Sequence, residues 1–149
     1  MVEALLSVLL SIVVLFLHDR LMRCLTAMQR KLPMFAVVLI LAASHSLHIW
    51  LYAGAVYVGE RWLKIGHIEN LPQPSDFTDY VYFSATNYTS LGYGDYIAHD
   101  GLRLIVTFEC LIGLMAIGWS TAFAFWWMQR HWLRECQENG SFLAPKKKN

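Results

Sequence analysis

The sequence predicts an all-α membrane protein with three spanning helices and a fourth, shorter helix that enters the membrane without crossing it. Hydrophobic residues make up 56% of the 149 residues and charged residues only 15%, which is too apolar for an ordinary soluble domain. Three long apolar runs also come close to the length of about 20 residues that a helix needs to cross a bilayer.

The first apolar run extends from Ala4 to Leu17, within residues 1–32. Glu3 precedes the run and basic residues follow it, which is the reverse of a signal peptide. The run has no polar face, so a spanning helix is favoured over an interfacial one. We expect a cytoplasmic extension beyond it. Apolar residues of this extension recur at helical spacing: Leu21, Leu25, Met28 and Leu32. The spacing fits an interfacial helix and a plain continuation of the spanning helix equally well.

The remaining runs predict a second unit over residues 33–128. Its outer helix is expected over residues 33–59, because the fixed φ of a proline suits the first helical turn. Residues 60–74 contain two prolines and read as an irregular outer loop. The inner helix is expected over residues 102–128, and residues 129–149 form a polar cytoplasmic tail.

Basic residues near the ends of spans are retained on the cytoplasmic side of a membrane. They gather between the first and second runs and after the third: Arg20, Arg23, Arg30, Lys31, Arg130, Arg134, Lys146, Lys147 and Lys148. We therefore expect a plasma-membrane protein with its N-terminus outside and its C-terminus in the cytoplasm. Membrane lipid is the expected partner, including anionic lipid at the basic segments, and nucleic acid is not.

A segment too short to cross the membrane, residues 75–89, precedes the third run. Ser75 or Asp76 can cap its first turn, and Asp79 adds negative charge at the positive end of the helix dipole. The segment leads into Ser-Leu-Gly-Tyr-Gly-Asp at residues 90–95. Glycine permits the dihedral angles that turn successive carbonyls toward one axis, where they can replace the hydration shell of a monovalent cation.

Residues 90–95 resemble the selectivity filter of the potassium-channel pore family, which reads Thr-Val-Gly-Tyr-Gly-Asp after a short pore helix. The four residues from Gly92 to Asp95 are identical to that filter. Tyr82-Phe83-Ser84, together with Thr89, resembles the common ending of the family's pore helix. The likeness covers Met34 to Met128, and the additional first span is similar to that of small microbial three-span relatives.

The resemblance implies the pore-forming subunit of a potassium-selective channel, with no enzymatic activity and no cofactor besides the permeant K⁺. Its filter would consist of Ser90, Leu91, Gly92, Tyr93 and Gly94. The carbonyls of the first four would bind K⁺, and the Ser90 hydroxyl would complete the innermost site. Because one filter strand cannot surround an ion, the resemblance also implies a homotetramer with closed symmetry.

The resemblance further implies a set of residues that support the filter: Asp95, Thr89, Tyr82 and Phe83. Asp95 would tie the outer mouth to the pore helix. Tyr93 would point away from the axis and pack on aromatic side chains, with Tyr80, Tyr82 and Phe83 as candidates.

Two residues depart from the family's filter. Ser90 replaces threonine, which keeps the hydroxyl group but loses the stiffening methyl group, and Leu91 replaces valine. A looser innermost site would discriminate less between K⁺ and Na⁺. A weakly selective monovalent cation channel is therefore the alternative function.

The predicted inner helix contains two glycines of interest, and the predicted spans contain three ionisable residues that call for an account. Gly113 and Gly118 are candidates for a gating hinge or for close helix packing, and both interpretations stay open. His45 and His48 share one helical face, and with Glu109 they suggest a pH sensor, a metal site or, as a third function, a membrane metalloenzyme. The structural alternative, which we favour, is a hydrogen-bonded support behind the pore helix.

Overall fold

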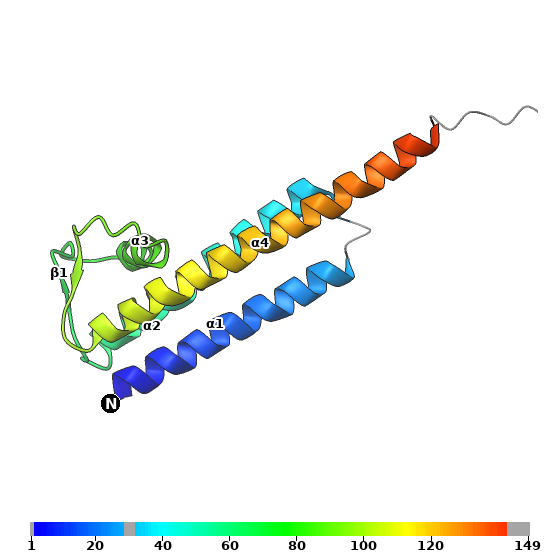
Figure 1. Ribbon diagram of the computed structural model, residues 1–149. Helices are drawn as coiled ribbons and strands as arrows, with labels where there is room; N and C mark the ends of the chain where they lie inside the picture. Colours follow the sequence, from blue (N-terminus) through cyan, green and yellow to red (C-terminus); the bar gives the residue numbers. More distant parts are fainter. Residues whose placement is uncertain (1, 29–31, 143–149) are drawn as a thin grey trace, which may run out of the picture.

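The computed structural model describes residues 2–28 and 32–142. Within these residues, three long helices lie side by side, and a short helix packs at one end of the bundle beside a pair of two-residue strands (Figure 1). The elements in chain order are α1 (Val2–Ala27), α2 (Met34–Arg61), β1 (Ile68–Glu69), α3 (Phe77–Tyr88), β2 (Ile97–Ala98) and α4 (Leu102–Phe142).

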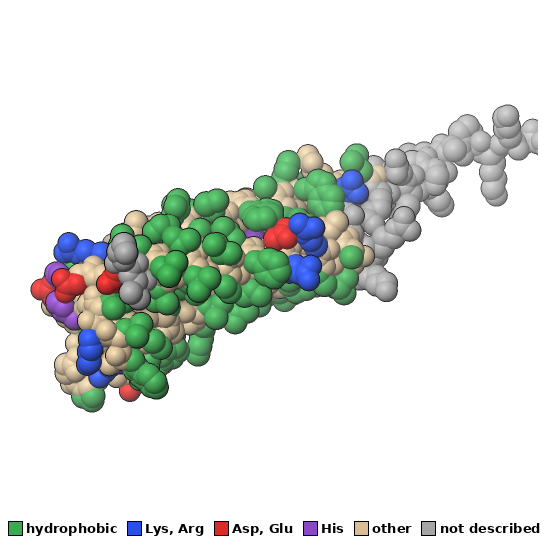
Figure 2. All heavy atoms as spheres, turned by 90° about the horizontal axis from the view of Figure 1, so that it is seen from below, with side chains coloured by type: hydrophobic (Ala, Val, Ile, Leu, Met, Phe, Trp, Pro, Cys, Tyr) green, Lys and Arg blue, Asp and Glu red, His purple; other side chains and the backbone are tan. Residues whose placement is uncertain are grey.

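The three long helices are apolar enough to cross a membrane over Glu3–Ala27, Met34–Arg61 and Leu102–Leu133. Hydrophobic side chains cover most of the sides of the bundle, and charged side chains gather toward its ends (Figure 2). Many large apolar side chains are exposed, such as Leu5 and Phe35 at 72% each. Lipid tails would cover such a surface, since they are as apolar as these side chains. The expected all-helical membrane protein with three candidate spans is therefore present.

Each end of the bundle has its own hydrophobic core. Side chains of all four helices meet at the α3 end, among them Val14, Tyr52, Phe83, Tyr88 and Ile105. A second core at the other end holds Met22, Leu25, Val37, Leu41 and Trp127. Because Met22 and Leu25 are buried in this core, α1 continues within the bundle as far as Ala27, where the sequence left an interfacial helix equally open.

The start of α3 is fastened to the end of α2. Asp76 precedes the first turn, and its backbone N–H donates to the Asp79 carboxylate at 2.8 Å. The Tyr80 hydroxyl donates to Glu60 at 2.6 Å and accepts from Arg61 Nε at 3.1 Å. Because the Tyr80 side chain is buried, these polar contacts hold the helix at a defined place on α2.

The strands join the two connections that flank α3. They pair antiparallel, with Ile68 opposite Ala98 and Glu69 opposite Ile97. Glu60 also accepts the backbone N–H of Ile68 at 2.8 Å, so one carboxylate holds both β1 and α3. Because β2 pairs with β1, the segment that follows α3 is held in place at its C-terminal end.

The end of α3 approaches α4 at Gly113. A Cβ atom at this glycine would lie 2.0 Å from the carbonyl oxygen of Tyr88, so no other residue allows the approach. At Gly118 a Cβ atom would meet nothing within 4 Å. Both glycines lie inside one continuous helix. Gly113 therefore has a packing role, whichever residue acts as a hinge.

We expect Gly113→Ala to lower the free energy of unfolding by roughly 1–3 kcal/mol, because the obstructing atom belongs to the backbone and cannot swing aside. Gly118→Ala is the matched control and should be neutral or stabilising by up to about 1 kcal/mol through helix propensity. Circular dichroism during denaturant unfolding in detergent micelles measures both. Equal destabilisation of the two variants would contradict the close contact.

Candidate functional site

The segment of residues 90–95, directly after α3, has an alternating backbone conformation. Ser90, Gly92 and Gly94 have φ angles of 57°, 53° and 75°, whereas Leu91 and Tyr93 between them do not have positive φ. Left-handed residues at every second position turn successive peptide planes against one another. Glycine adopts this region freely, but Ser90 does so at a conformational cost. The glycines were identifiable from the sequence, and the conformation of Ser90 was not.

The peptide N–H groups at the start of this segment bond back to α3. Leu91 and Gly92 donate to the Thr86 carbonyl at 2.9 and 3.1 Å, and Ser90 donates to the Asn87 carbonyl at 2.8 Å. Within the described residues, no hydrogen bond reaches the carbonyl oxygens of residues 90–93. The first three N–H donors of the segment are therefore occupied, while the four carbonyl acceptors of residues 90–93 are free in the described chain, an arrangement suited to binding a cation.

The segment 90–95 is exposed in the single chain. Leu91 is 60% exposed and Tyr93 is 70% exposed. Beside it, a hollow of about 450 Å³ lies between α3 and α4 and is lined by Phe83, Thr86, Asn87, Gly92, Gly94 and Tyr96, among others. Large apolar side chains next to an open hollow form a surface that another chain can cover.

Asp95 is joined to α3 by a hydrogen bond. The Tyr82 hydroxyl donates to Asp95 Oδ2 at 2.8 Å, and the Tyr96 N–H donates to Oδ1 at 3.1 Å. The Tyr82 and Tyr96 rings meet edge to face, with centroids 5.6 Å apart. The hydrogen bond to the carboxylate is the largest of the effects that raise the pKa of Tyr82 above its ordinary value.

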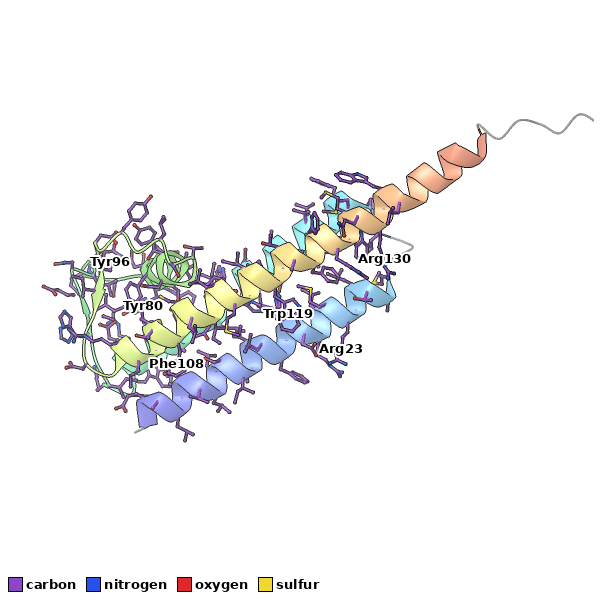
Figure 3. All side chains as sticks on the ribbon, viewed as in Figure 1. Arg23, Tyr80, Tyr96, Phe108, Trp119 and Arg130 are labelled. Carbon is purple, nitrogen blue, oxygen red and sulfur yellow. The ribbon has the colours of Figure 1, made fainter. Side chains whose placement is uncertain are left out.

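The other expected supporting residues have separate contacts. Phe83 is buried in the core at the α3 end, and the Thr89 hydroxyl donates to the Ala85 carbonyl at 2.7 Å. Tyr80 is buried and hydrogen-bonded to Glu60 and Arg61, whereas Tyr93 is 70% exposed. Tyr93 therefore does not pack on Tyr80 within one chain. Tyr80 and Tyr96 both lie at the α3 end of the bundle (Figure 3).

The structure separates Glu109 from the two histidines. Glu109 is fully buried beneath α3, where the Ser84 hydroxyl donates to its Oε1 at 2.6 Å. His45 and His48 instead share the Tyr88 hydroxyl, at 3.0 and 3.1 Å from their Nδ1 atoms. Among the described residues, no group of three His, Cys, Asp or Glu is placed to hold a metal ion. These three residues thus do not form the metal site that the sequence suggested.

A third histidine, His18 of α1, belongs to the same cluster and was missed by the sequence reasoning. The Ser120 hydroxyl lies 3.3 Å from His18 Nε2 and 3.0 Å from His45 Nε2, which links α1 to α2 through α4. His18 lies just after the first apolar run, and no local pattern indicates which helix it faces. Thr86 and Asn87 were missed as well, because they act through backbone carbonyls that every residue carries.

The contact between Asp95 and Tyr82 predicts a titration shift. We expect Asp95→Asn to lower the pKa of Tyr82 toward its ordinary value of about 10, because the variant removes the carboxylate that favours the neutral phenol. NMR of protein labelled at tyrosine Cζ measures this, with Tyr82→Phe assigning the signal. Asp100→Asn is the control, since Asp100 faces His67 and should leave Tyr82 unchanged. An unshifted Tyr82 in Asp95→Asn would refute the contact.

A comparison with known families gives a match. A family model described as an ion channel matches residues 35–130, which is more than half of the chain and includes α3, the segment 90–95 and most of α2 and α4. Comparisons with curated proteins and with solved structures give no match.

Proposed function

Because the chain belongs to the potassium-channel pore-domain family of ion channels, we propose that it is the pore-forming subunit of a potassium-selective channel. It would conduct K⁺ passively through the carbonyl oxygens of Ser90, Leu91, Gly92 and Tyr93. The observation that carries this proposal is the alternating left-handed backbone of residues 90–94, whose carbonyls accept no hydrogen bond within the described residues.

The surroundings of the segment favour a monovalent cation. The C-terminal end of α3, at Tyr88, precedes the segment directly, and the end of a helix carries partial negative charge. Carbonyl dipoles add further attraction without the full charge that would trap the ion. K⁺ can therefore exchange water for carbonyl oxygens and still leave.

We propose that four chains assemble around the ion pathway. One chain supplies one strand of carbonyls, which cannot enclose an ion, so closed fourfold symmetry is the simplest arrangement. The exposed side chains of Leu91 and Tyr93 and the hollow beside them support this assembly. Neighbouring copies would cover that surface and provide the packing that Tyr93 lacks in the single chain.

The proposed orientation in the plasma membrane places the α3 end outside. Arg23 and Arg130 lie toward the opposite end of the bundle, which would be cytoplasmic (Figure 3). Anionic lipid would bind at that end. Several of the basic residues expected to contribute lie outside the described residues: Arg30, Lys31, Lys146, Lys147 and Lys148.

K⁺ flux from liposomes containing the purified protein tests the proposal. We expect flux in the wild type and none in Gly92→Asp, because a side chain strains the left-handed backbone and its charge would trap cations. Asn70→Asp is the matched control. It adds the same carboxylate in the exposed outer connection and should keep wild-type flux. Flux that persists in Gly92→Asp would refute the assigned pathway.

Ser90 favours the second candidate function, a weakly selective monovalent cation channel. Its left-handed φ of 57° is a conformation that β-branched threonine rarely adopts, which fits a less rigid innermost site. The reversal potential of single channels between K⁺ and Na⁺ solutions distinguishes the two functions. We expect it to follow the K⁺ gradient. A potential that follows Na⁺ as strongly would overturn K⁺ selectivity in favour of the alternative.

A further inference from the structure

Five polar side chains form a continuous row inside the bundle. The row, which we call the histidine row, runs from His48 through Tyr88, His45 and Ser120 to His18. Its members come from all four helices, and α1 contributes only His18. Buried polar groups between spanning helices are costly and face the protein interior, so a complete row of them calls for a chemical account.

The neutral row has two alternative arrangements of its hydrogen-bond donors. A neutral imidazole donates from one nitrogen and accepts at the other, while a hydroxyl donates one hydrogen bond and accepts another. The Tyr88 hydroxyl can therefore donate to only one of His45 and His48 and must accept from the other. Ser120 stands in the same relation to His45 and His18. All donors in the row consequently point toward His18 or all point toward His48.

The row has room for one additional proton. His18 is completely buried, and its Nδ1 atom has no hydrogen-bond partner within the described residues. The three imidazole rings lie 5.5–6.0 Å apart, a separation at which two positive charges repel strongly in a buried site. One charge can be shared along the row, and a second cannot.

We propose that the histidine row is a binding site for a single proton shared by His18, His45 and His48. An incoming proton makes one imidazole an imidazolium. That ring passes its other proton to the bonded hydroxyl oxygen, which releases its own proton to the next ring, so the charge moves while atoms balance. His48 lines a hollow of about 310 Å³ between α1 and α2, so this end of the row is not fully covered by side chains in the single chain.

Other titratable groups lie close enough to influence this proton. Burial and the neighbouring His45 disfavour a positive charge on His18, whereas Asp19 of α1 favours it. Tyr52 of α2 and Glu109 of α4 act on Tyr88, although Glu109 is bonded to Ser84 and is not a member of the row. The row therefore has an acidic side chain near each of two members, Asp19 near His18 and Glu109 near Tyr88.

Tyr88 couples the proton to the segment 90–95. Tyr88 is the last residue of α3, and its backbone carbonyl lies against Gly113 of α4. When the proton passes between His48 and His45, the Tyr88 hydroxyl takes up a proton from one ring and releases its own to the other, so its donor direction reverses. Conduction should then depend on pH, a consequence that rests on the proposed channel function.

Trp119 provides a direct readout of the proton. Its ring lies edge-on to His18 with centroids 5.5 Å apart, and it is found between α4 and α1 (Figure 3). A protonated imidazole quenches a neighbouring indole. We expect the fluorescence difference between the wild type and Trp119→Phe in lipid nanodiscs to show a single transition between about pH 8 and about pH 4. His18→Gln should abolish it, and no transition in the wild type would overturn the proposal.

Two variants that remove a hydroxyl group of the row test whether the proton is shared among the three histidines or bound by His18 alone. Tyr88→Phe keeps the ring but disconnects His48, so the transition should move by about one pH unit to lower pH. Ser120→Ala cuts the row at a second place and should act in the same direction. His67→Gln changes an exposed histidine near the strands and is the control without effect. Unchanged transitions in both row variants would overturn the sharing.

Flux of K⁺ measured over the same pH range tests the coupling. We expect flux in the wild type to change at the pH of the fluorescence transition and to move with it in Tyr88→Phe. Constant flux across that transition would overturn the coupling. Absence of flux at every pH, with the fluorescence transition intact, would refute the channel function and uphold the proton site.

Discussion

The close approach of Tyr88 to Gly113 is the constraint on which the functional end of the molecule depends. A helix as short as α3 has little stability of its own, and its position comes from packing. The missing side chain at Gly113 lets the backbone at the end of α3 lie directly on α4. The segment that leaves α3 therefore starts from a defined point, and the Tyr88 hydroxyl is carried to the two histidines of α2.

In the segment after α3, the first peptide N–H groups make hydrogen bonds, whereas the carbonyl oxygens accept none within the described residues. A chain in an apolar environment must satisfy its peptide donors, and Thr86 and Asn87 accept them at the helix end. The carbonyl oxygens of residues 90–93 stay available in the described chain. The same geometry serves stability and the proposed function, because carbonyls that completed a helix or a sheet could not bind an ion.

Local patterns in the sequence predicted the three apolar helices and the short helix after Asp76, and they singled out the glycines at 92 and 94, which have positive φ. Each of these depends on neighbouring residues alone: run length, capping and dihedral freedom. The contacts that relate distant helices were out of reach. His18 and Ser120 are 102 positions apart, and Glu109 pairs with Ser84 rather than with a histidine because of how α3 settles on α4.

The row gives α1 a role beyond adding a third apolar surface. A helix that only anchored the chain in lipid would gain nothing from a buried imidazole, since placing a polar group among spanning helices opposes insertion. His18 makes its one hydrogen bond to a residue of α4, and its other nitrogen has no partner among the described residues. That vacant position is costly as long as the row is neutral. The hydrogen bonds of the row offset part of the cost of an arriving proton, because the charge can move to the other rings instead of residing on His18.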